Sequence, residues 1–368
     1  MAPPTPCRRP PSRDFTEGTC KIVIDLKEFT DELPNSLIAA YPTRDRKASR
    51  LLVVKRNTGE LIHSIFSELG NFLDSGDLLV LNDTKVFPAR LRGRKESGGK
   101  VEILLLERFS EKRSLWIAIV DGAKKPGVGS RIRFNENMTA QIIGDLGRGR
   151  FGLEFYHSGD FNAQLRALGE PPLPHYITRT RRTAELDWQR YQTVYAANPG
   201  AIAAPTAGFH FTPELFQALQ AKGIETALLT LHVGPGTFQP VREERVENHR
   251  MEGERYILPA GTAARINRAK QHRHRVVAVG STSTRTLEWI ARQKGKVEAD
   301  HGIARLFLRP GDLFQVIDAL ITNFHLPTST PLVLVVAFAG LDLVRRAYAE
   351  AIKMQYRFYS YGDAMLIL

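Results

Sequence analysis

The sequence predicts an α/β protein, in which a mostly parallel, helix-covered sheet domain carries an inserted small β-barrel domain. Between about Gly76 and Tyr156, short strand-like runs follow one another with glycine-containing turns and no room for helices, a pattern typical of a small barrel. From Asp160 onward, strand-like runs alternate with helical segments, which indicates a parallel sheet covered by helices. The chain has 368 residues, 43% of them hydrophobic, which is enough for two domains and a sizeable core.

The first residues of the chain differ in composition from the rest. Residues 1–19 are rich in proline and arginine with almost no aliphatic side chains, and they lack the apolar stretch of a secretory signal. We therefore predict a disordered N-terminal extension over residues 1–19. The α/β domain is predicted to comprise residues 20–75 and 157–368, with the barrel domain occupying residues 76–156 between them.

The individual elements follow from short apolar runs and their flanking residues. The expected barrel strands are LLVLND, KVEILLLE, SLWIAIV, SRIRF and FGLEF. In the α/β domain we expect strands at ETALLTLHV, RVVAVG and PLVLVVAF, the last because it is a short, β-branched apolar run. Helices are expected near residues 212–222, 260–271, 284–293 and 341–353, and the first of these ends at Lys222-Gly223.

The charge balance is strongly basic. Lysine and arginine total 51 against 39 aspartate and glutamate residues, which gives a formal net charge of +12. Such a surplus favours polyanionic partners, because a protein that neutralises phosphates releases their counterions. The basic residues cluster near residues 44–50, 90–95 and 179–182. Each cluster alone is typical of a solvated surface, and together they could line a groove for nucleic acid.

The cysteines indicate the redox environment. Only Cys7 and Cys20 occur, so the core has no disulfide framework and we expect a reducing, cytoplasmic location. Two thiols are also too few for a zinc site or iron–sulfur cluster held by three or four thiolates. No apolar run reaches the roughly 18 residues that a membrane span needs, so no membrane association is expected.

Several common catalytic motifs are missing from the sequence. GRKESGGK (Gly93 to Lys100) resembles a P-loop, but its spacing is off by one and no serine or threonine follows the lysine. No glycine-rich dinucleotide loop follows a strand. Neither the H-E-x-x-H nor the G-x-S-x-G motif occurs. The chemistry must therefore reside in other polar groups or in a bound cosubstrate.

The segment GSTSTRTLE follows a predicted strand and opens a helix. Ser281, Thr282 and Arg285 would therefore lie at a helix N-terminus, where backbone N–H groups and the helix dipole favour phosphate or carboxylate. The alternative is ordinary helix capping, for which one serine or threonine suffices. We favour anion binding, since several hydroxyls and an arginine are present together.

Three further segments place polar residues where strands are expected to end. AAPTAGFHF contains Thr206, Phe209 and His210, of which the histidine taken alone is more often structural than catalytic. His232 follows the next strand, just before a Gly-Pro-Gly turn. Ligands of open α/β sheets bind at the carboxyl ends of strands, so a shared pocket is plausible.

The segment ITNFHLPTST contributes Asn323, His325 and Ser329, immediately ahead of the expected strand PLVLVVAF. The chain then ends in YRFYSYGDAMLIL, whose aromatic side chains surround Gly362 and Asp363. Aromatics such as Tyr361 could stack on nucleobases, or they could complete a core.

Taken together, eight segments of the chain resemble one family, the S-adenosylmethionine:tRNA ribosyltransferase-isomerases of queuosine biosynthesis. They are SRLLV, LNDTKVFPARLRG, RYQTVYA, AAPTAGFHFT, TLHVGPGTF, STSTRTLE, TNFHLP and YRFYSYGDAML, and they run from about residue 22 to the C-terminus. The resemblance implies an α/β domain with an inserted β-barrel. It implies transfer of the ribosyl part of S-adenosylmethionine onto 7-aminomethyl-7-deazaguanine at the tRNA wobble position, giving epoxyqueuosine and releasing adenine and methionine.

The same resemblance implies the partners. They are S-adenosylmethionine, as a cosubstrate rather than a resident cofactor, and tRNA with a queuosine-type anticodon. No metal is expected, and we expect a monomer. Two other functions stay open: an S-adenosylmethionine-dependent RNA methyltransferase, and a non-catalytic RNA-binding protein built on the barrel and the basic clusters.

The reaction chemistry suggests roles for individual side chains. A sulfonium acidifies the adjacent 5′ C–H, so a general base could remove that proton, and an acid must help adenine leave. We assign His210 or His232 to proton transfer, with His325 as a third candidate. Asp83 and Asp363 would orient the substrate amine. Arg285 with Ser281 and Thr282 would hold an anion, and the remaining substrate-binding candidates are Thr206, Phe209, Asn323 and Tyr361.

Three positions depart from the pattern of the family that the chain resembles. Ser281 stands where threonine is usual, and Pro331 where leucine is usual. Glu252 stands where a histidine after the methionine is expected, which puts any proton-transfer role of that position in doubt.

Overall fold

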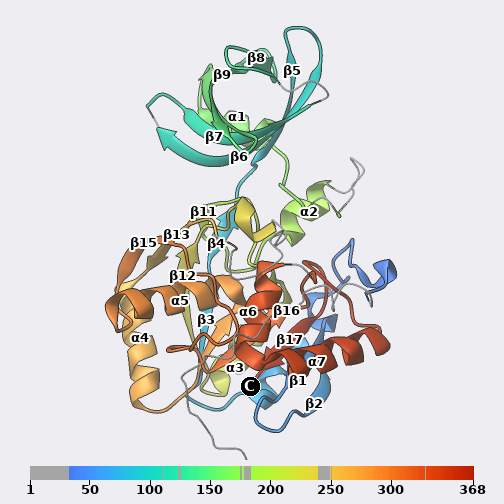
Figure 1. The fold of residues 1–368 in the computed structure, drawn as a ribbon, viewed down its shortest axis with the longest axis vertical. Coiled ribbons are helices and arrows are strands. Elements are labelled where there is room, and N and C mark those ends of the chain that lie inside the picture. Colours follow the sequence, from blue (N-terminus) through green and yellow to red (C-terminus); the bar gives the residue numbers. More distant parts are fainter. Residues whose placement is uncertain are drawn as a thin grey trace, which may run out of the picture.

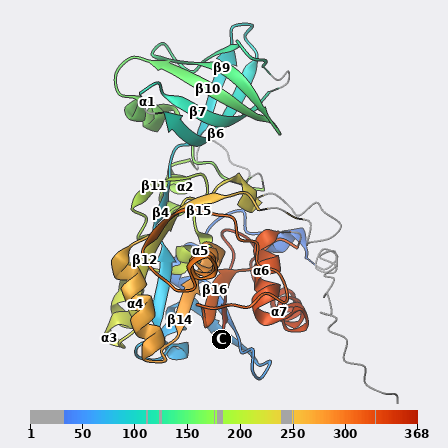
Figure 2. The same ribbon diagram turned by 60° about the vertical axis from the view of Figure 1, so that its left-hand side comes forward.

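A computed structural model describes residues 33–110, 112–122, 126–174, 176–177, 184–238, 249, 251–327 and 329–368. The predicted N-terminal extension, both cysteines and the basic cluster near residues 179–182 lie outside these residues. The described residues form an α/β body with a separate β-barrel above it (Figure 1, Figure 2). The predicted fold class is confirmed.

The α/β body is built on one nine-stranded sheet. Its strands are, in order across the sheet, β15 (Asp300–Ala304), β13 (Glu254–Leu258), β12 (Glu225–Leu231), β3 (Leu78–Asn82), β14 (Val276–Val279), β16 (Ala319–Asn323), β17 (Ala364–Ile367), β1 (Arg50–Val54) and β2 (Leu61–Ile65). The four central strands β12, β3, β14 and β16 are mutually parallel, so their carboxyl ends meet at one edge. Strand β17 runs antiparallel to β16 and parallel to β1.

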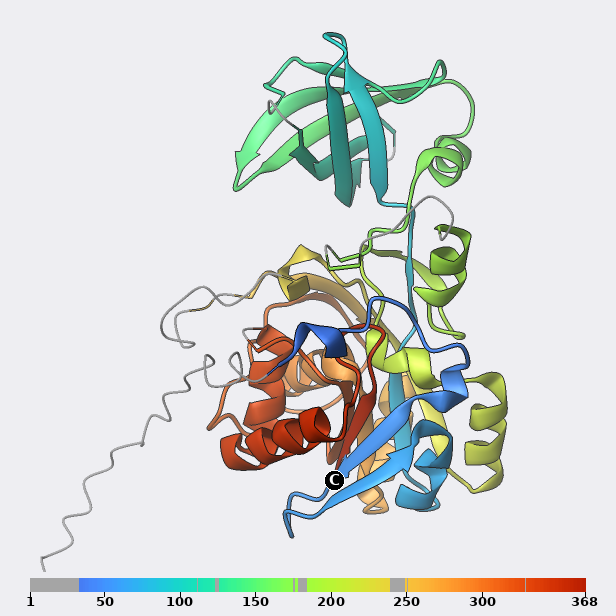
Figure 3. The ribbon, with the colours of Figure 1, turned by 90° about the vertical axis from the view of Figure 1, so that its right-hand side faces the viewer.

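Helices cover both faces of the sheet (Figure 3). One core packs the sheet against the helices α4 (Ala260–Gln271), α5 (Gly280–Lys294), α6 (Thr330–Ala339) and α7 (Leu341–Lys353). The other core packs alternate strand residues against η4 (Phe66–Phe72), η6 (Thr206–His210) and α3 (Pro213–Ala221). Strands β3, β14 and β16 are buried throughout, as expected for a parallel sheet with both faces covered.

The segment PLVLVVAF is a helix, so its prediction as a strand is wrong. Helix α6 begins after Ser329, whose side chain accepts a hydrogen bond from the backbone N–H of Leu332, and it has Pro331 in its first turn. It ends at Gly340, whose φ of +87° favours glycine. A helix that is apolar all round is a buried helix, and its composition alone does not distinguish it from a strand. Helix α5 also begins earlier than expected, at Gly280.

The barrel closes with six antiparallel strands. They are β5 (Arg90–Lys95), β6 (Lys100–Ser110), β7 (Leu115–Asp121), β8 (Arg131–Arg133), β9 (Met138–Gly147) and β10 (Arg150–His157). Their inward side chains form a core with Phe161 and Leu165 of the following helix α1 (Phe161–Leu168). The run LLVLND was expected in the barrel, but β3 pairs with β12 and β14 in the large sheet. Strand β3 is apolar on both faces and is therefore buried in the large sheet. The first strand of the barrel is β5, which begins at Arg90.

Short elements connect the barrel to the sheet. They are β4 (Thr84–Val86), which pairs with β11 (Asn198–Ala201), and α2 (Ala184–Arg190). The other short elements are η2 (Asn35–Leu37) and η3 (Arg46–Ala48), which precede β1, and η7 (Pro235–Phe238), which follows β12. Within the described residues, no helix is long and apolar enough to cross a bilayer.

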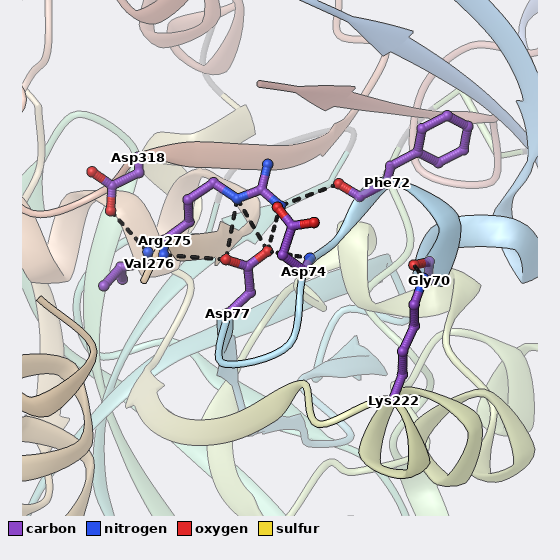
Figure 4. A network of polar contacts seen from close by, with 8 residues as sticks. All are labelled: Gly70, Phe72, Asp74, Asp77, Lys222, Arg275, Val276 and Asp318. Carbon is purple, nitrogen blue, oxygen red and sulfur yellow. Dashed lines mark hydrogen bonds and ion pairs between the residues drawn. The ribbon is translucent and has the colours of Figure 1, made fainter. Parts of the chain in front are cut away.

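The amino ends of the central strands are joined by a polar network (Figure 4). The buried carboxylate of Asp77, just before β3, accepts hydrogen bonds from Nε of Arg275 at 3.1 and 3.0 Å. Asp74 pairs with the same guanidinium at 2.9 Å, and Asp318 accepts from the backbone N–H of Val276 at 2.8 Å. The contact with Asp77 raises the pKa of Arg275. This network fixes the start of three strands, and therefore where their carboxyl ends lie.

Candidate active site

The predicted site residues gather at the carboxyl edge of the parallel strands. Asp83 follows β3, His232 follows β12, α5 begins directly after β14, and Asn323 is the last residue of β16. The short helix η6, which carries Thr206, Phe209 and His210, packs against β16 and α5 at the same edge. The expected meeting of strand ends is therefore present in the structure.

His210 and Asn323 contact each other directly. The Asn323 side-chain amide lies 3.3 Å from Nε2 of His210 and donates to the carbonyl oxygen of Tyr359 at 3.2 Å. Both partners of this amide nitrogen must be acceptors, because an amide NH₂ only donates. Nε2 of His210 therefore carries no proton in the neutral ring, and Nδ1–H is its donor. The Asn323 side-chain oxygen is buried and has no hydrogen-bond partner in the described residues.

Burial keeps His210 neutral. The residue is 3% exposed, and its ring lies against Phe66 with centroids 5.0 Å apart. Burial, followed by the charge of Arg46, lowers the pKa of His210 to about 3. The imidazole is therefore uncharged at neutral pH, and it acts as a hydrogen-bond donor more readily than as a strong base.

A small cavity of about 20 Å³ lies beside His210. Its wall includes Phe209 and Tyr361, whose rings stack with centroids 5.8 Å apart, and the guanidinium of Arg46. Arg46 donates to the carbonyl oxygens of Phe209 at 2.7 Å and Gln192 at 2.9 Å. This volume is roughly that of one water molecule, so a nucleoside enters only if side chains move.

His232 is held by a threonine. Its Nδ1 lies 2.8 Å from the Thr84 hydroxyl, and the ring packs on Gly200. A Cβ at Gly200 would come within 2.7 Å of the imidazole, so only glycine fits there. Burial, with the nearby charge of Arg255, lowers the pKa of His232. The contact at Nδ1 leaves Nε2 for another partner.

Asn82, the last residue of β3, and Asp83 after it are both held by hydrogen bonds. Asp83 is buried, and its two oxygens accept from the Thr230 hydroxyl at 2.6 Å and the Asn198 amide at 3.0 Å. Asn82 donates to the hydroxyl of Thr282 at 3.1 Å, which ties β3 to the start of α5. Each Asp83 oxygen retains one lone pair that could accept from a ligand.

The expected anion site at α5 is partly neutralised. Arg285 is 5% exposed and forms an ion pair with the buried carboxylate of Glu254. Its Nε donates to the carbonyl oxygen of Leu306 at 3.0 Å, while its Nη2 is buried without a partner in the described residues. Arg285 and Ser281 line a cavity of about 10 Å³ together with Thr330. The carboxylate of Glu254 therefore balances the positive charge of Arg285, and one guanidinium donor remains for a ligand.

The structure does not bring His325 and Asp363 into this group. Nε2 of His325 lies 2.6 Å from the Thr322 hydroxyl, and burial lowers the pKa of His325 to about 4. Asp363 is 2% exposed and accepts from the backbone N–H groups of Arg50 at 2.9 Å and Arg357 at 2.8 Å. Its carboxylate also pairs with the Arg50 side chain at 3.2 Å. Among the described residues, no hydrogen bond or ion pair joins either side chain to His210, His232 or Arg285. No side-chain contact of Thr206 is described.

Sequence reasoning missed three residues of the site. The sequence around Glu254 has no pattern that distinguishes this residue from a surface residue, yet its carboxylate forms an ion pair with Arg285. Thr84 lies within the family segment LNDTKVFPARLRG, but its hydrogen-bond partner His232 is 148 positions away in the sequence. Arg46 was assigned to a solvated cluster, whereas its burial lowers its pKa to about 10. No group of three or more histidine, cysteine, aspartate or glutamate side chains suited to a metal ion occurs in the described part of the chain.

This chain is similar in sequence to known proteins. The family model described as "Queuosine biosynthesis protein" matches residues 26–367. Proteins named S-adenosylmethionine:tRNA ribosyltransferase-isomerase are similar in Trichlorobacter lovleyi, with 48% identity over 343 residues, and in Pelobacter propionicus, with 49% identity over 342 residues. Each alignment covers 93% of this chain and 99% of the relative.

A solved structure is also similar. The crystal structure of S-adenosylmethionine tRNA ribosyltransferase from Thermotoga maritima, at 2.00 Å resolution, has 37% sequence identity to this chain and a TM-score of 0.51. The match covers 92% of this chain and 98% of that chain.

Proposed function

The chain belongs to the queuosine biosynthesis family of S-adenosylmethionine:tRNA ribosyltransferase-isomerases, and from this we propose how the carboxyl edge of its sheet works. The enzyme transfers and isomerises the ribosyl moiety of S-adenosylmethionine onto 7-aminomethyl-7-deazaguanine at the tRNA wobble position. The products are epoxyqueuosine-tRNA, adenine and methionine. The observation that carries the location of the site is the contact of 3.3 Å between His210 and Asn323, which come from segments 113 residues apart.

The reaction requires three things of the protein. A base must remove the 5′ proton that the sulfonium acidifies, a donor must assist the departure of adenine, and the substrate amine must be neutral when it attacks the ribosyl group. Positioned acid and base groups each supply about 10²–10⁴-fold of rate. Holding the two substrates in contact supplies much of the rest.

His232 is the base in this proposal. Its lowered pKa keeps the ring neutral at pH 7 and thus able to accept a proton. When Nδ1–H donates to the Thr84 hydroxyl, Nε2 holds the free lone pair and can remove the 5′ proton. Thr84 is then a positioning residue, because it acts only through the orientation and tautomer of His232.

His210 is the donor that assists adenine. Asn323 occupies Nε2, so Nδ1–H is directed at the ligand, and the pKa of about 3 keeps the ring neutral. A neutral imidazole N–H can hydrogen-bond a purine ring nitrogen as the glycosidic bond breaks, without the charge of an imidazolium. The stacked rings of Phe209 and Tyr361 would contact the base beside it.

The remaining polar residues bind substrate. The free Nη2 of Arg285 and the hydroxyl of Ser281 would hold the methionine carboxylate, near the positive end of α5. Asp83 would orient the substrate amine with its remaining lone pairs. Thr206 and Thr282 complete the wall, while His325 and Asp363 keep the loop after β16 and the C-terminal turn in place.

Ligand binding must enlarge this region. The two cavities of about 20 and 10 Å³ are far below the volume of a nucleoside, since small-molecule pockets usually measure about 300–1,000 Å³. S-adenosylmethionine therefore binds with a rearrangement of η6 or of the start of α5. The substrate tRNA carries a queuosine-type anticodon, and the enzyme works as a monomer in the cytoplasm, where tRNA is modified.

The test is a reaction with tRNA that carries 7-aminomethyl-7-deazaguanine. Protein and S-adenosylmethionine are added, and the tRNA nucleosides and small molecules are quantified by mass spectrometry. We expect epoxyqueuosine and adenine in equal amounts. Formation of S-adenosylhomocysteine with a methylated nucleoside would instead identify a methyltransferase. Binding of tRNA without any binding of S-adenosylmethionine would identify an RNA-binding module.

Variants then test the residue roles. His232→Ala and His210→Ala should each lower kcat by about 10²-fold or more. His272→Ala, on the exposed end of α4, is the matched control and should keep the wild-type rate. If both site variants turn over normally while remaining folded, the proposed proton transfers are wrong although the family assignment stands.

A further inference from the structure

The barrel carries a concave basic surface that is separate from the candidate active site. This surface encloses about 1960 Å³, and its lining includes Arg94, Lys100, Arg133 and the aromatic Tyr156. None of its lining residues lines the cavities beside His210 or Arg285. The volume exceeds the roughly 300–1,000 Å³ of typical small-ligand pockets, so the surface has room for part of a macromolecule.

The strand register places three cations side by side. Lys100 of β6 is directly opposite Arg94 of β5, and Arg94 is directly opposite Arg133 of β8. The row continues through Thr139 of β9 to Tyr156 of β10. All three cations are exposed on the outside of the barrel, because their neighbours Val101 and Ile132 point into its core. We call Lys100, Arg94, Arg133, Thr139 and Tyr156 the cross-strand row.

Such a row is unfavourable without a ligand. Like charges directly opposite on neighbouring strands destabilise a sheet. Of the carboxylates that line this surface, Glu102 pairs with two other cations, Arg90 at 3.4 Å and Arg92 at 3.6 Å. Among the described residues, no ion pair involves Arg94, Lys100 or Arg133, and Arg94 donates only to the carbonyl oxygen of Gly98 at 3.0 Å.

The geometry of the row fits a phosphodiester chain. Neighbouring strands lie about 4.8 Å apart, so the three cations span roughly 10 Å and can contact two or three successive phosphates. At the end of the row, Tyr156 is 50% exposed and offers a ring on which a base or ribose can stack. A basic surface that ends in an exposed aromatic is typical of single-strand and loop recognition on RNA.

We propose that the cross-strand row binds the sugar–phosphate backbone of the substrate tRNA at a part of the molecule outside the wobble nucleotide. This inference rests on the proposed function, which supplies tRNA as the partner. The barrel stands apart from the α/β body (Figure 1), so one tRNA contacts the protein at two places. The wobble base enters the site at the sheet edge, while the barrel holds the backbone and contributes affinity without touching the reacting atoms.

The experiment measures tRNA binding as a function of salt for the full-length protein. The variant Arg94→Glu/Arg133→Glu reverses two charges of the row. The control Lys296→Glu/Lys353→Glu makes the same change in net charge at exposed positions of the α/β body. The slope of log Kd against log salt reports the number of phosphates neutralised, at about 0.7–0.9 per contact.

We expect the slope of the row variant to fall by about 1.5 and its Kd for tRNA to rise at least about tenfold at 0.15 M salt. The control should keep the wild-type slope. At saturating tRNA, both variants should release adenine at the wild-type kcat. Arg133→Gln, which removes one of the opposed cations, should lower the slope by about one contact and leave the melting temperature of the free protein unchanged or raised.

Equal slopes for the row variant and the control would overturn the inference. A wild-type protein that released no adenine from S-adenosylmethionine would contradict the proposed function instead, so the two failures are distinguishable. If Arg94→Glu/Arg133→Glu did not fold, Arg133→Gln would decide, because an unchanged slope in that folded variant also contradicts the inference.

Discussion

Arg150 of barrel strand β10 forms an ion pair with Glu252, which lies just before strand β13 of the α/β body. A second ion pair, between Glu107 of β6 and Arg255 of β13, joins the same two parts of the protein. Glu252 is also the position at which the family resemblance led us to expect a histidine. The carboxylate that stands there joins the barrel to the segment before β13.

The Arg150–Glu252 pair should show coupling between its members. Both side chains are partly exposed, so we expect Arg150→Ala and Glu252→Gln each to lower the free energy of unfolding by about 0–1 kcal/mol. The double variant should lose less than the sum of the two, which urea denaturation of the four proteins in a double-mutant cycle would measure. Strict additivity would show that the pair contributes nothing in solution.

The buried His210 should make stability depend on pH. Its pKa is about 3 in the folded protein and 6.5 in the unfolded chain, so the unfolded state binds more protons below pH 6.5. The contribution of the neutral ring is complete above pH 6.5 and is lost as pH falls toward 3, by up to roughly 1.4 kcal/mol per pH unit. Denaturation of His210→Gln between pH 4 and 8 should give a flatter curve than wild type. Replacement of the exposed His272 by glutamine should leave the wild-type curve, and identical curves for all three proteins would contradict the burial effect.

Thr84 should act on catalysis through His232. Thr84→Val removes the hydroxyl but keeps the volume, so we expect kcat to fall about 10–100-fold with little change in the KM for either substrate. Thr84→Ser keeps the hydroxyl and should restore most of the rate. The pH profile of kcat should also shift in Thr84→Val, because the valine cannot fix the tautomer of His232. A variant that lost affinity but kept kcat would indicate a substrate-binding threonine instead.

The Arg285–Glu254 pair should be costly to break from one side. Both side chains are almost fully buried, so Glu254→Gln leaves an uncompensated guanidinium and should lower the free energy of unfolding by about 3–5 kcal/mol. Replacing both residues, as Arg285→Met/Glu254→Met, should destabilise the fold less than either single change. The double variant should nevertheless bind S-adenosylmethionine weakly, as measured by calorimetry, because the Nη2 donor is gone. Wild-type binding by that variant would remove Arg285 from the site.

The sequence was sufficient for the layout of the fold and for the family. Strand β14, for example, is a short valine-rich run between two clear helices, so local pattern determines it. Helix α6 was misread because an apolar run has no period to measure, although Ser329, Pro331 and Gly340 mark helix boundaries. Strand β3 was misplaced because an isolated apolar strand does not reveal which partners it pairs with.

The site was less predictable than the fold. The sequence located His210, His232 and Asn323 at one edge, because residues at carboxyl strand ends share that edge. It did not show that Glu254 neutralises Arg285, or that Arg50 and two backbone N–H groups occupy Asp363. Glu254 and Arg285 are 31 positions apart in the sequence, and Arg50 and Asp363 are 313 positions apart, so charge patterning along the chain carries no information about these pairs.

The order of the sheet has a consequence for synthesis on the ribosome. Strand β17 follows all the other strands of the sheet in the sequence, yet it lies between β16 and β1 within the sheet. Strand β1 pairs with β17 and with β2, and β17 in turn pairs with β16. Strands β1 and β2, which are made before most of the sheet, therefore cannot join it until Ala364–Ile367 have left the exit tunnel. The barrel pairs only with itself and can close while translation continues, because domains fold as units. The α/β body completes its sheet only after β17 has been made, so a chain that stopped before Ala364 would present an unpaired edge at β16.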